Sequence, residues 1–329
     1  MTSVNSPFKH CLRIFAVVSA FYLFAIPVSA KPKLVVVIVI DQMRADYLTR
    51  FQDLYGEGGF KRLMNDGAYF TNCKYTYSET QTGPGHATIL SGLPPRFSGI
   101  IANDWYVPSL GHTIYCVSDS SVRSVGTDPA GSGGRMSPRN FLGTSLADQL
   151  LSASPSSKCI GIALKDRAAI LPVGKHPTAA YWFDEDNGIW VTSTYYRQAL
   201  PTWVQVFNGR KLPEQSFGKV WAKLLPDSAY ARQGKDDAAG EDDFPGQKKS
   251  VFPYTIRDLA GDKSDQRFYA FVSSPFGLEH TAAFAETSIV AEQLGKRDAT
   301  DLLSVSFSST DWIGHTFGPD SYEIEDMYL

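Results

Sequence analysis

The chain has 329 residues, of which 43% are hydrophobic, so it can bury the core of one large domain or of two ordinary ones. Its formal net charge is −3, and its acidic and basic residues are scattered along the sequence. This charge distribution gives no support for nucleic acid as a specific partner.

The first thirty residues are typical of a secretory signal peptide. Lys9 and Arg13 precede an apolar run over residues 14–26, and small residues lead up to Ala30. The run is shorter than the roughly twenty apolar residues that a membrane-spanning helix needs. We therefore expect cleavage after Ala30, a periplasmic or secreted protein, and no stable membrane anchor after cleavage.

The cysteines set few constraints. Cys11 lies in the signal peptide, and Cys73, Cys116 and Cys159 remain. These three can form one disulfide at most, and the sequence does not show which pair would form it. Since no Cys-x-x-Cys pair occurs, a zinc site built from cysteines is not expected.

The mature chain begins with an unbroken, mostly β-branched run at residues 33–40 that ends in Asp41. A run without alternation predicts a central strand that is buried on both faces of a parallel sheet. Ligand sites in open α/β folds form at the carboxyl ends of such strands. Asp41 is therefore either a site residue or a cap for the following turn.

The segment that starts at Thr82 and ends at His86 predicts the beginning of a helix. Pro84 suits the first turn, and Thr82 falls at or next to the N-cap. A hydroxyl at this place lies among unpaired backbone N–H groups at the positive end of the helix dipole, which suits an anion such as phosphate. A threonine that only caps a surface helix would show the same local pattern.

Strands, polar ends and helices recur further along the chain. Core strands are predicted at residues 158–164 and 302–307, and helical patterns near residues 145–151 and 282–294 precede them. This recurrence favours a doubly wound α/β fold with a mostly parallel sheet.

Residues 178–282 differ in character from the rest. A hairpin is predicted over residues 181–192, with a glycine-containing turn, and residues 233–250 are polar and loop-like. We interpret this region as an insertion or cap on the core. The expected parts are a signal peptide, the first part of the core, the cap and a return to the core, at residues 1–30, 31–177, 178–282 and 283–329.

The sequence Lys165-Asp166-Arg167 follows directly after the second predicted strand. In an extended segment, residues two apart project to the same side, so both cations can face one ligand. An ammonium and a planar guanidinium together suit a phosphoryl group with two negative charges. A charged loop in solvent is the alternative.

Asp311 and His315 follow the third predicted strand. If this segment is helical, residues four apart share a face, and the carboxylate and the imidazole can converge. Oxygen and imidazole donors suit Zn²⁺, although an Asp-x-x-x-His pair also occurs by chance in many chains.

Five elements in this order resemble the alkaline phosphatase superfamily: Asp41, the segment 82–86, Asn103-Asp104-Trp105, the segment 165–167, and Asp311-x-x-x-His315. Within it, the chain is similar to the threonine-nucleophile, phosphate-irrepressible alkaline phosphatases of bacterial periplasms. The resemblance runs from about Leu34 to the last residue. It implies a zinc-dependent phosphomonoesterase that acts on small phosphate monoesters through a phosphothreonine intermediate.

The resemblance also implies a role for each site residue. Thr82 would be the nucleophile and, with Asp41, a ligand of one zinc ion. Asp311 and His315 would bind a second zinc ion. Coordination to a metal is one way to activate a threonine hydroxyl, and two metals can clamp the entering and leaving oxygens of a displacement at phosphorus.

Three further residues would hold the non-bridging phosphoryl oxygens: Asn103, Lys165 and Arg167. Nucleotide pyrophosphatases/phosphodiesterases of the same superfamily share the threonine and the asparagine but lack the Lys-x-Arg pair. Because a diester carries only one negative charge, two cations favour monoesters. A phosphodiesterase remains the alternative interpretation. Sulfatases are disfavoured because they carry Cys or Ser in place of Thr82.

One part of the family pattern is missing. The family completes its zinc sites with an adjacent Asp-His pair and a further histidine downstream of the position of His315, and this sequence has neither. We therefore expect a C-terminally truncated chain whose sheet is incomplete. We also expect the 329-residue polypeptide to be inactive or to bind only phosphate or metal, because a reduced ligand set weakens metal binding.

The other histidines have plainer interpretations. His86 is expected to order the start of the helix at Thr82, and three histidines are expected at the surface or in loops: His112, His176 and His280. Trp105 is expected to be a packed aromatic residue.

Overall fold

A six-stranded sheet forms the centre of the fold, with the strand order β1-β10-β5-β6-β7-β4. The structure is a computed structural model that describes residues 31–129, 131–230, 234–260 and 267–329. The first four strands are parallel: β1 (Leu34–Ile40), β10 (Asp301–Phe307), β5 (Cys159–Ala163) and β6 (Ala179–Asp184). Two antiparallel strands complete the sheet: β7 (Ile189–Ser193) and β4 (Ser124–Val125). The predicted α/β class and the three predicted core strands are confirmed.

The predicted signal peptide, residues 1–30, lies outside the described residues. The chain divides into residues 1–32 and 33–329, and the sheet belongs to the second unit. In the described part of the chain, no helix is both long and apolar enough to cross a membrane.

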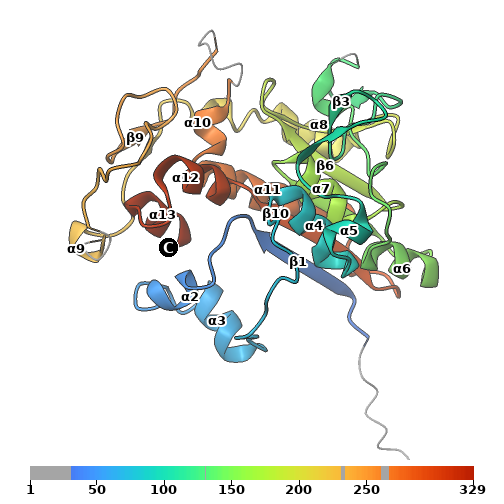
Figure 1. The fold of residues 1–329 in the computed structure, drawn as a ribbon, viewed down its shortest axis with the longest axis horizontal. Helices are drawn as coiled ribbons and strands as arrows, with labels where there is room; N and C mark the ends of the chain where they lie inside the picture. Colours follow the sequence, from blue (N-terminus) through green and yellow to red (C-terminus); the bar gives the residue numbers. More distant parts are fainter. Residues whose placement is uncertain (1–30, 130, 231–233, 261–266) are drawn as a thin grey trace, which may run out of the picture. The chain divides into compact units, whose positions relative to one another are not determined.

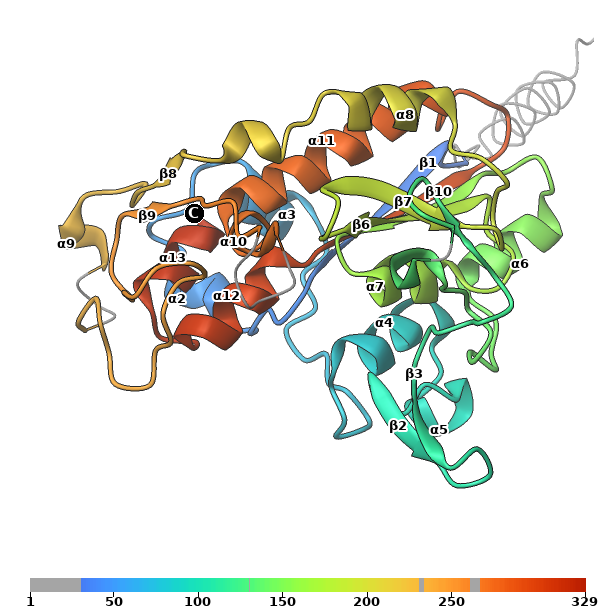
Figure 2. The same cartoon turned by 90° about the horizontal axis from the view of Figure 1, so that it is seen from above.

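Helices cover both faces of the sheet (Figure 2). One face carries α8 (Thr202–Gly209) and α11 (Pro275–Ala291), and the other carries α4 (Thr82–Ser91), α6 (Leu146–Ala153) and α7 (Asp166–Ile170). Alternate residues of β6 point to opposite faces, so Tyr181 packs in the core under α11 and Trp182 in the core under α7. The helices predicted near residues 145–151 and 282–294 are confirmed as α6 and α11.

The strand β1 lies at the edge of the sheet, not at its centre (Figure 1). It pairs only with β10 among the described residues, and Val36 and Ile38 are 44% and 58% exposed. The prediction of a central strand buried on both faces is therefore wrong for this chain. An apolar run reports that a strand suits burial, but the sheet order depends on which strands are present to pair with it. The described residues leave one long edge unpaired, as the predicted incomplete sheet requires.

The hairpin predicted over residues 181–192 is present as β6 and β7. Gly188 closes its turn in the left-handed region, with φ +69°. However, β6 also pairs with β5, so the hairpin is part of the central sheet. The predicted start of the cap at residue 178 is corrected accordingly, since residues 179–193 belong to the core. The other domain boundaries stay predictions.

The segment after β7 contains short elements: β8 (Val220–Trp221), α9 (Asp227–Tyr230), β9 (Tyr254–Thr255) and α10 (Tyr269–Val272). Residues 234–250 form no helix or strand, which agrees with the predicted loop. Six further elements occur elsewhere: α2 (Tyr47–Arg50), α3 (Gly59–Asp66), α5 (Pro95–Ser98), η1 (Ser132–Gly134), η2 (Leu171–Val173) and η3 (Glu214–Ser216). An antiparallel hairpin of β2 (Asp104–Val107) and β3 (His112–Tyr115) projects beside α4 and α5 (Figure 2).

Two helices follow β10: α12 (Ser309–Phe317) and α13 (Tyr322–Tyr328). The carboxylate of Asp326 in α13 accepts hydrogen bonds from Trp221 Nε1 at 2.6 Å, from the Leu224 backbone N–H at 2.7 Å and from the Tyr230 hydroxyl. Glu323 Oε1 accepts a hydrogen bond from the Tyr254 hydroxyl at 2.5 Å. Buried acids of α13 thus anchor the segment that carries β8, α9 and β9.

The prediction that His280 lies at the surface is wrong. His280 is buried in α11, and its Nε2 accepts a hydrogen bond from Trp190 Nε1 at 2.9 Å. Burial lowers the pKa of His280 to about 3, so the ring is neutral and able to accept. His112 and His176 are exposed, as predicted. Trp105 packs against the core under α7. The three described cysteines are free.

Candidate active site

Three neighbouring parallel strands bring the predicted site residues together at their carboxyl ends. Asp41 follows β1, Lys165 follows β5, and Asp311 lies in the first turn of α12, directly after β10. Because β10 pairs in parallel register with both β1 and β5, the ends of these strands meet at one edge of the sheet. The fold therefore places residues that are far apart in the sequence side by side.

Thr82 is the first residue of α4, and Gln81 is the N-cap. The predicted position at or next to the N-cap is confirmed, with Pro84 in the first turn. The Thr82 side chain is buried, and its Oγ1 donates a hydrogen bond to Asp41 Oδ2 at 3.3 Å. The Thr82 hydroxyl thus lies at a helix N-terminus, beside a carboxylate that accepts its hydrogen bond.

His86 holds the first turn of α4 against the sheet. Its Nδ1 lies 2.8 Å from the Thr82 carbonyl oxygen, and its Nε2 lies 2.8 Å from Ser306 Oγ in β10. A carbonyl oxygen can only accept, so Nδ1 carries the proton and Nε2 accepts from the serine hydroxyl. Burial lowers the pKa of His86, which keeps this neutral tautomer. The expected ordering role of His86 is confirmed.

Asn103 packs against the same helix turn. Its Oδ1 accepts a hydrogen bond from the Gly83 backbone N–H at 2.8 Å, and its backbone N–H donates to Gln81 Oε1 at 2.6 Å. A side chain at Gly83 would place its Cβ 3.1 Å from Asn103 Oδ1 and 3.2 Å from Cys116 Sγ. Glycine therefore permits the close approach, and the Asn103 amide keeps its N–H donors for a ligand.

Lys165 joins the two carboxylates of the site. Its side chain is 4% exposed, and its Nζ donates to Asp41 Oδ2 at 2.8 Å and to Asp311 Oδ2. Burial alone would raise the pKa of Asp41, but the surrounding positive groups, with the Lys165 ammonium first among them, together outweigh this effect and the pKa lies below its ordinary value. Asp41 is therefore a carboxylate at neutral pH.

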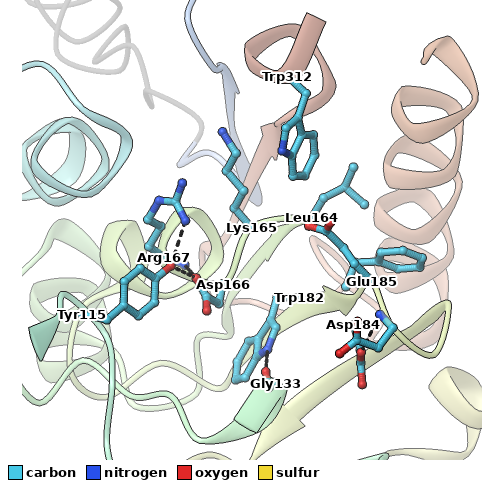
Figure 3. Close-up of a pocket in the computed structure, with 12 residues that line it drawn as sticks. Tyr115, Gly133, Leu164, Lys165, Asp166, Arg167, Trp182, Asp184, Glu185 and Trp312 are labelled. Carbon is cyan, nitrogen blue, oxygen red and sulfur yellow. Dashed lines mark hydrogen bonds between the residues drawn. The ribbon is translucent and has the colours of Figure 1, made fainter. Parts of the chain in front are cut away.

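Arg167 lies in the first turn of α7, two residues after Lys165. The prediction of an extended segment here is wrong, because α7 begins at Asp166. Both charged side chains nevertheless extend from the same loop toward the same side (Figure 3). Arg167 Nη1 donates to the Tyr115 hydroxyl at 2.8 Å, and this hydroxyl donates to Asp166 Oδ1. Tyr115 has no signal in the sequence, and Asp166 is visible there only as the residue between the two cations.

Asp311 and His315 share one face of α12, as predicted. Their Oδ1 and Nε2 atoms are 3.4 Å apart, and the His315 side chain is 71% exposed. A cavity of about 470 Å³ is lined by six of the seven predicted site residues: Asp41, Thr82, Asn103, Arg167, Asp311 and His315. The seventh, Lys165, contacts two of them and lines a neighbouring cavity of about 310 Å³ together with Arg167 (Figure 3).

Three of the four donor groups of this site, the two carboxylates and the imidazole, are of the types that zinc prefers. Asp41 and Thr82 offer a carboxylate and a hydroxyl, and Asp311 and His315 offer a carboxylate and an imidazole. The number of donors is small: within the described ranges, no group of three or more His, Cys, Asp or Glu side chains is arranged to hold one metal ion.

Comparison with known protein families shows to which family the chain belongs. The sequence model of the family described as type I phosphodiesterase / nucleotide pyrophosphatase matches residues 35–329. The chain belongs to this family. It is thereby a member of the alkaline phosphatase superfamily, as the five ordered elements predicted.

Curated relatives of this phosphodiesterase-family chain carry more specific names. It is 45% identical to alkaline phosphatase PafA of Elizabethkingia meningoseptica over 91% of its length and 54% of the relative's. It is also 45% identical to alkaline phosphatase PhoV of Synechococcus elongatus, with the same coverage. A protein of Myroides odoratus named as a calcium-transporting ATPase is 44% identical over 96% of this chain and 58% of that one. The chain thus spans about half the length of these relatives.

Solved structures agree with the fold. The crystal structure of wild-type alkaline phosphatase PafA matches with a TM-score of 0.85 and 45% identity, and the match covers 91% of this chain and 57% of the other. A PafA variant with a substituted threonine, asparagine, lysine and arginine also matches with a TM-score of 0.85. Those four positions are separated by the same intervals as Thr82, Asn103, Lys165 and Arg167 in this family member.

Proposed function

We propose that the complete protein is a zinc-dependent phosphomonoesterase with Thr82 as its nucleophile. The observation that carries this proposal is the joint position of Lys165 and Arg167 beside the buried Thr82 hydroxyl. A phosphate monoester presents two negative charges, and two cations from one loop match them. The names of the alkaline phosphatase relatives and the matched intervals in the PafA variant support the same assignment.

The reaction follows from the atoms of the site. Thr82 Oγ would form a bond to phosphorus while the ester P–O bond breaks, and the alcohol would leave with a proton. Water would then cleave the phosphothreonine, releasing inorganic phosphate and restoring the Thr82 hydroxyl. The N–H donors of Asn103 and the cations of Lys165 and Arg167 would offset the charge on the non-bridging oxygens.

Two pairs of residues would hold two zinc ions. Asp41 and Thr82 would contribute to one site, and Asp311 and His315 to the other. Bound zinc would increase the acidity of the attacking hydroxyl and offset negative charge on the leaving oxygen. With two donors for each ion, we propose that the 329-residue chain alone binds zinc weakly and is inactive.

The second candidate function is phosphodiester hydrolysis, which the family description favours. The Lys-x-Arg pair argues against it because a diester has one negative charge for two cations. The Myroides relative is named as an ATPase, so the substrate in its name, ATP, is a third kind of phosphate compound. All three share in-line displacement at phosphorus and differ in the charge that the site must match.

The test compares a monoester with a diester on the product of the complete reading frame, supplied with zinc. We expect p-nitrophenyl phosphate to be the better substrate, and Lys165→Ala and Arg167→Ala to lower its kcat/KM far more than that of bis-p-nitrophenyl phosphate. Thr82→Ala should reduce monoester turnover by at least ~10³-fold, as expected for the loss of a nucleophile. Lys248→Ala, at an exposed lysine, is the control. A diester preference in the wild type would reverse the assignment.

We also propose that the protein is exported. The basic start and the apolar run of residues 14–26 support this localisation. Sequencing the N-terminus of the protein from a periplasmic fraction should give Lys31 as the first residue.

A further inference from the structure

The guanidinium of Arg167 is held by a tyrosine from another part of the chain. Tyr115 is the last residue of β3, and its hydroxyl oxygen accepts a hydrogen bond from Arg167 Nη1 at 2.8 Å. The Arg167 guanidinium also lies 5.8 Å from the centre of the Tyr115 ring. Nη2, the other terminal nitrogen, makes no hydrogen bond within the described part of the chain, so it is available to a ligand.

Asp166 determines the direction of this hydrogen bond. The Tyr115 hydroxyl has one proton, which it donates to Asp166 Oδ1, so its lone pairs face Arg167 (Figure 3). Burial, followed by the nearby Asp166 carboxylate, raises the pKa of Tyr115, which keeps the phenol protonated. Asp166 Oδ1 also accepts from the backbone N–H of Arg167 at 2.5 Å. The three groups therefore form one directed chain.

The base of the β2–β3 hairpin fixes Tyr115 relative to the rest of the site. Asn140 Nδ2 donates to the carbonyl oxygens of Tyr115 and Cys116, at 3.3 and 3.2 Å. The Cys116 backbone N–H donates to the Asn103 carbonyl oxygen at 2.8 Å. One small hairpin thus sets the position of Asn103 and, through Tyr115, the orientation of Arg167.

We propose that Tyr115 and Asp166 are positioning residues that fix the Arg167 guanidinium toward the cavity at Thr82. This inference rests on the proposed function. An arginine side chain has many rotamers, and holding one of them before the ligand arrives removes an ordering cost from binding. The hydrogen bond from Nη1 to Tyr115 fixes the orientation of the planar guanidinium, so that Nη2 can donate to a phosphoryl oxygen.

The test is Tyr115→Phe in the complete, zinc-supplied protein, because this change removes only the hydroxyl. We expect kcat/KM for p-nitrophenyl phosphate to fall about tenfold, as for the loss of a hydrogen bond to a charged group. The value for bis-p-nitrophenyl phosphate should change much less. In an Arg167→Ala background, Tyr115→Phe should cause no further loss, because the group that it orients is absent. Tyr106→Phe, at a tyrosine of β2 that is 60% exposed, is the matched control.

Two results would overturn the inference: an equal loss for both substrates, or full additivity of Tyr115→Phe with Arg167→Ala. Either result would mean that Tyr115 only supports the fold. If Tyr115→Phe does not fold, Asp166→Asn should give the same substrate-selective and non-additive loss. If the wild type hydrolyses no monoester, the proposed function fails, and the affinity for inorganic phosphate then decides the inference. Unchanged phosphate binding in Tyr115→Phe would reject it.

Discussion

Two regions of this protein that contain buried acids stabilise them in opposite ways. At the carboxyl ends of β1 and β10, Asp41 and Asp311 share the ammonium of Lys165, and the pKa of Asp41 lies below its ordinary value. On α13, Glu323 and Asp326 receive hydrogen bonds from neutral donors, and burial raises the pKa of Glu323 to about 8.

The difference separates the candidate active site from a structural anchor. A cation keeps Asp41 ionised, and an ionised carboxylate can bind a metal or accept the Thr82 hydrogen bond. Neutral donors satisfy the hydrogen-bonding capacity of the Asp326 carboxylate, so these contacts include no cation that a ligand could replace. Burial of an acid alone therefore does not distinguish the two regions, whereas the buried lysine between two acids does.

The largest expected effect comes from removing the cation. Lys165→Met keeps most of the side-chain volume but leaves the buried Asp41 and the largely buried Asp311 without their shared ammonium. We expect the free energy of unfolding to fall by about 3–5 kcal/mol in metal-free buffer, because breaking one side of a buried ion pair leaves an uncompensated charge. Urea denaturation in the presence of a chelator measures this loss.

The matched control for that experiment is Lys61→Met, whose partner Glu57 is 92% exposed. An exposed pair contributes about 0–1 kcal/mol, so this variant should unfold like the wild type. Equal effects of the two lysine substitutions would show that Lys165 does not hold the acids in the way described.

A smaller loss is expected at the structural anchor. Asp326→Ala leaves three donors without an acceptor, and we expect the free energy of unfolding to fall by about 2–4 kcal/mol. Asp326→Asn keeps one acceptor oxygen and should cost less. Neither change should alter the ratio of monoester to diester hydrolysis in the complete protein. A change of that ratio would connect α13 to the reaction and break the comparison.

The smallest effect, when it is counted per pH unit, is a change in pH dependence. The folded protein holds a proton on Glu323 up to a pKa of about 8, whereas the unfolded chain releases it near the ordinary value of 4.5. The free energy of unfolding therefore falls as the pH rises from 4.5 to 8, by about 1.4 kcal/mol per unit from this group, and levels off above 8.

Glu323→Gln removes this titration. Relative to the wild type, the variant should gain stability steadily between pH 5 and pH 8 and no more above pH 8. Chemical denaturation at several pH values measures the difference. A constant difference across this range would mean that Glu323 is not protonated in the folded state.

Sequence reasoning found the residues of the site because each follows a recognisable local element. Three of them come directly after strands: Asp41, Lys165 and Asp311. Thr82 begins a helix whose first turn contains Pro84, a residue typical of helix starts. Residues at the carboxyl ends of neighbouring parallel strands can converge at one edge of a sheet. The family resemblance that the five ordered elements carry predicted that these residues do converge.

The residues that support the site were not predictable in the same way. Tyr115 reaches Arg167 from a separate hairpin, and His280 pairs with Trp190 across the core, so neither has a local signal. The β-branched run of β1 shows that the strand suits burial but not which strands flank it. Contacts between distant elements decide all three cases, and composition does not encode them.

The parallel pairing of β1 with β10 also has a consequence for the order of synthesis. Leu34 pairs with Asp301, and the register continues to Ile40 and Phe307, so β1 has to wait for a partner strand that is made much later. Long-range parallel pairing of this kind is slow to form. On the ribosome, Asp41 and Thr82 emerge long before Asp311, and the constellation that surrounds the hydroxyl cannot assemble until translation has passed β10. The nascent chain thus carries Thr82 without Asp311 beside Asp41 until β10 and α12 have been made.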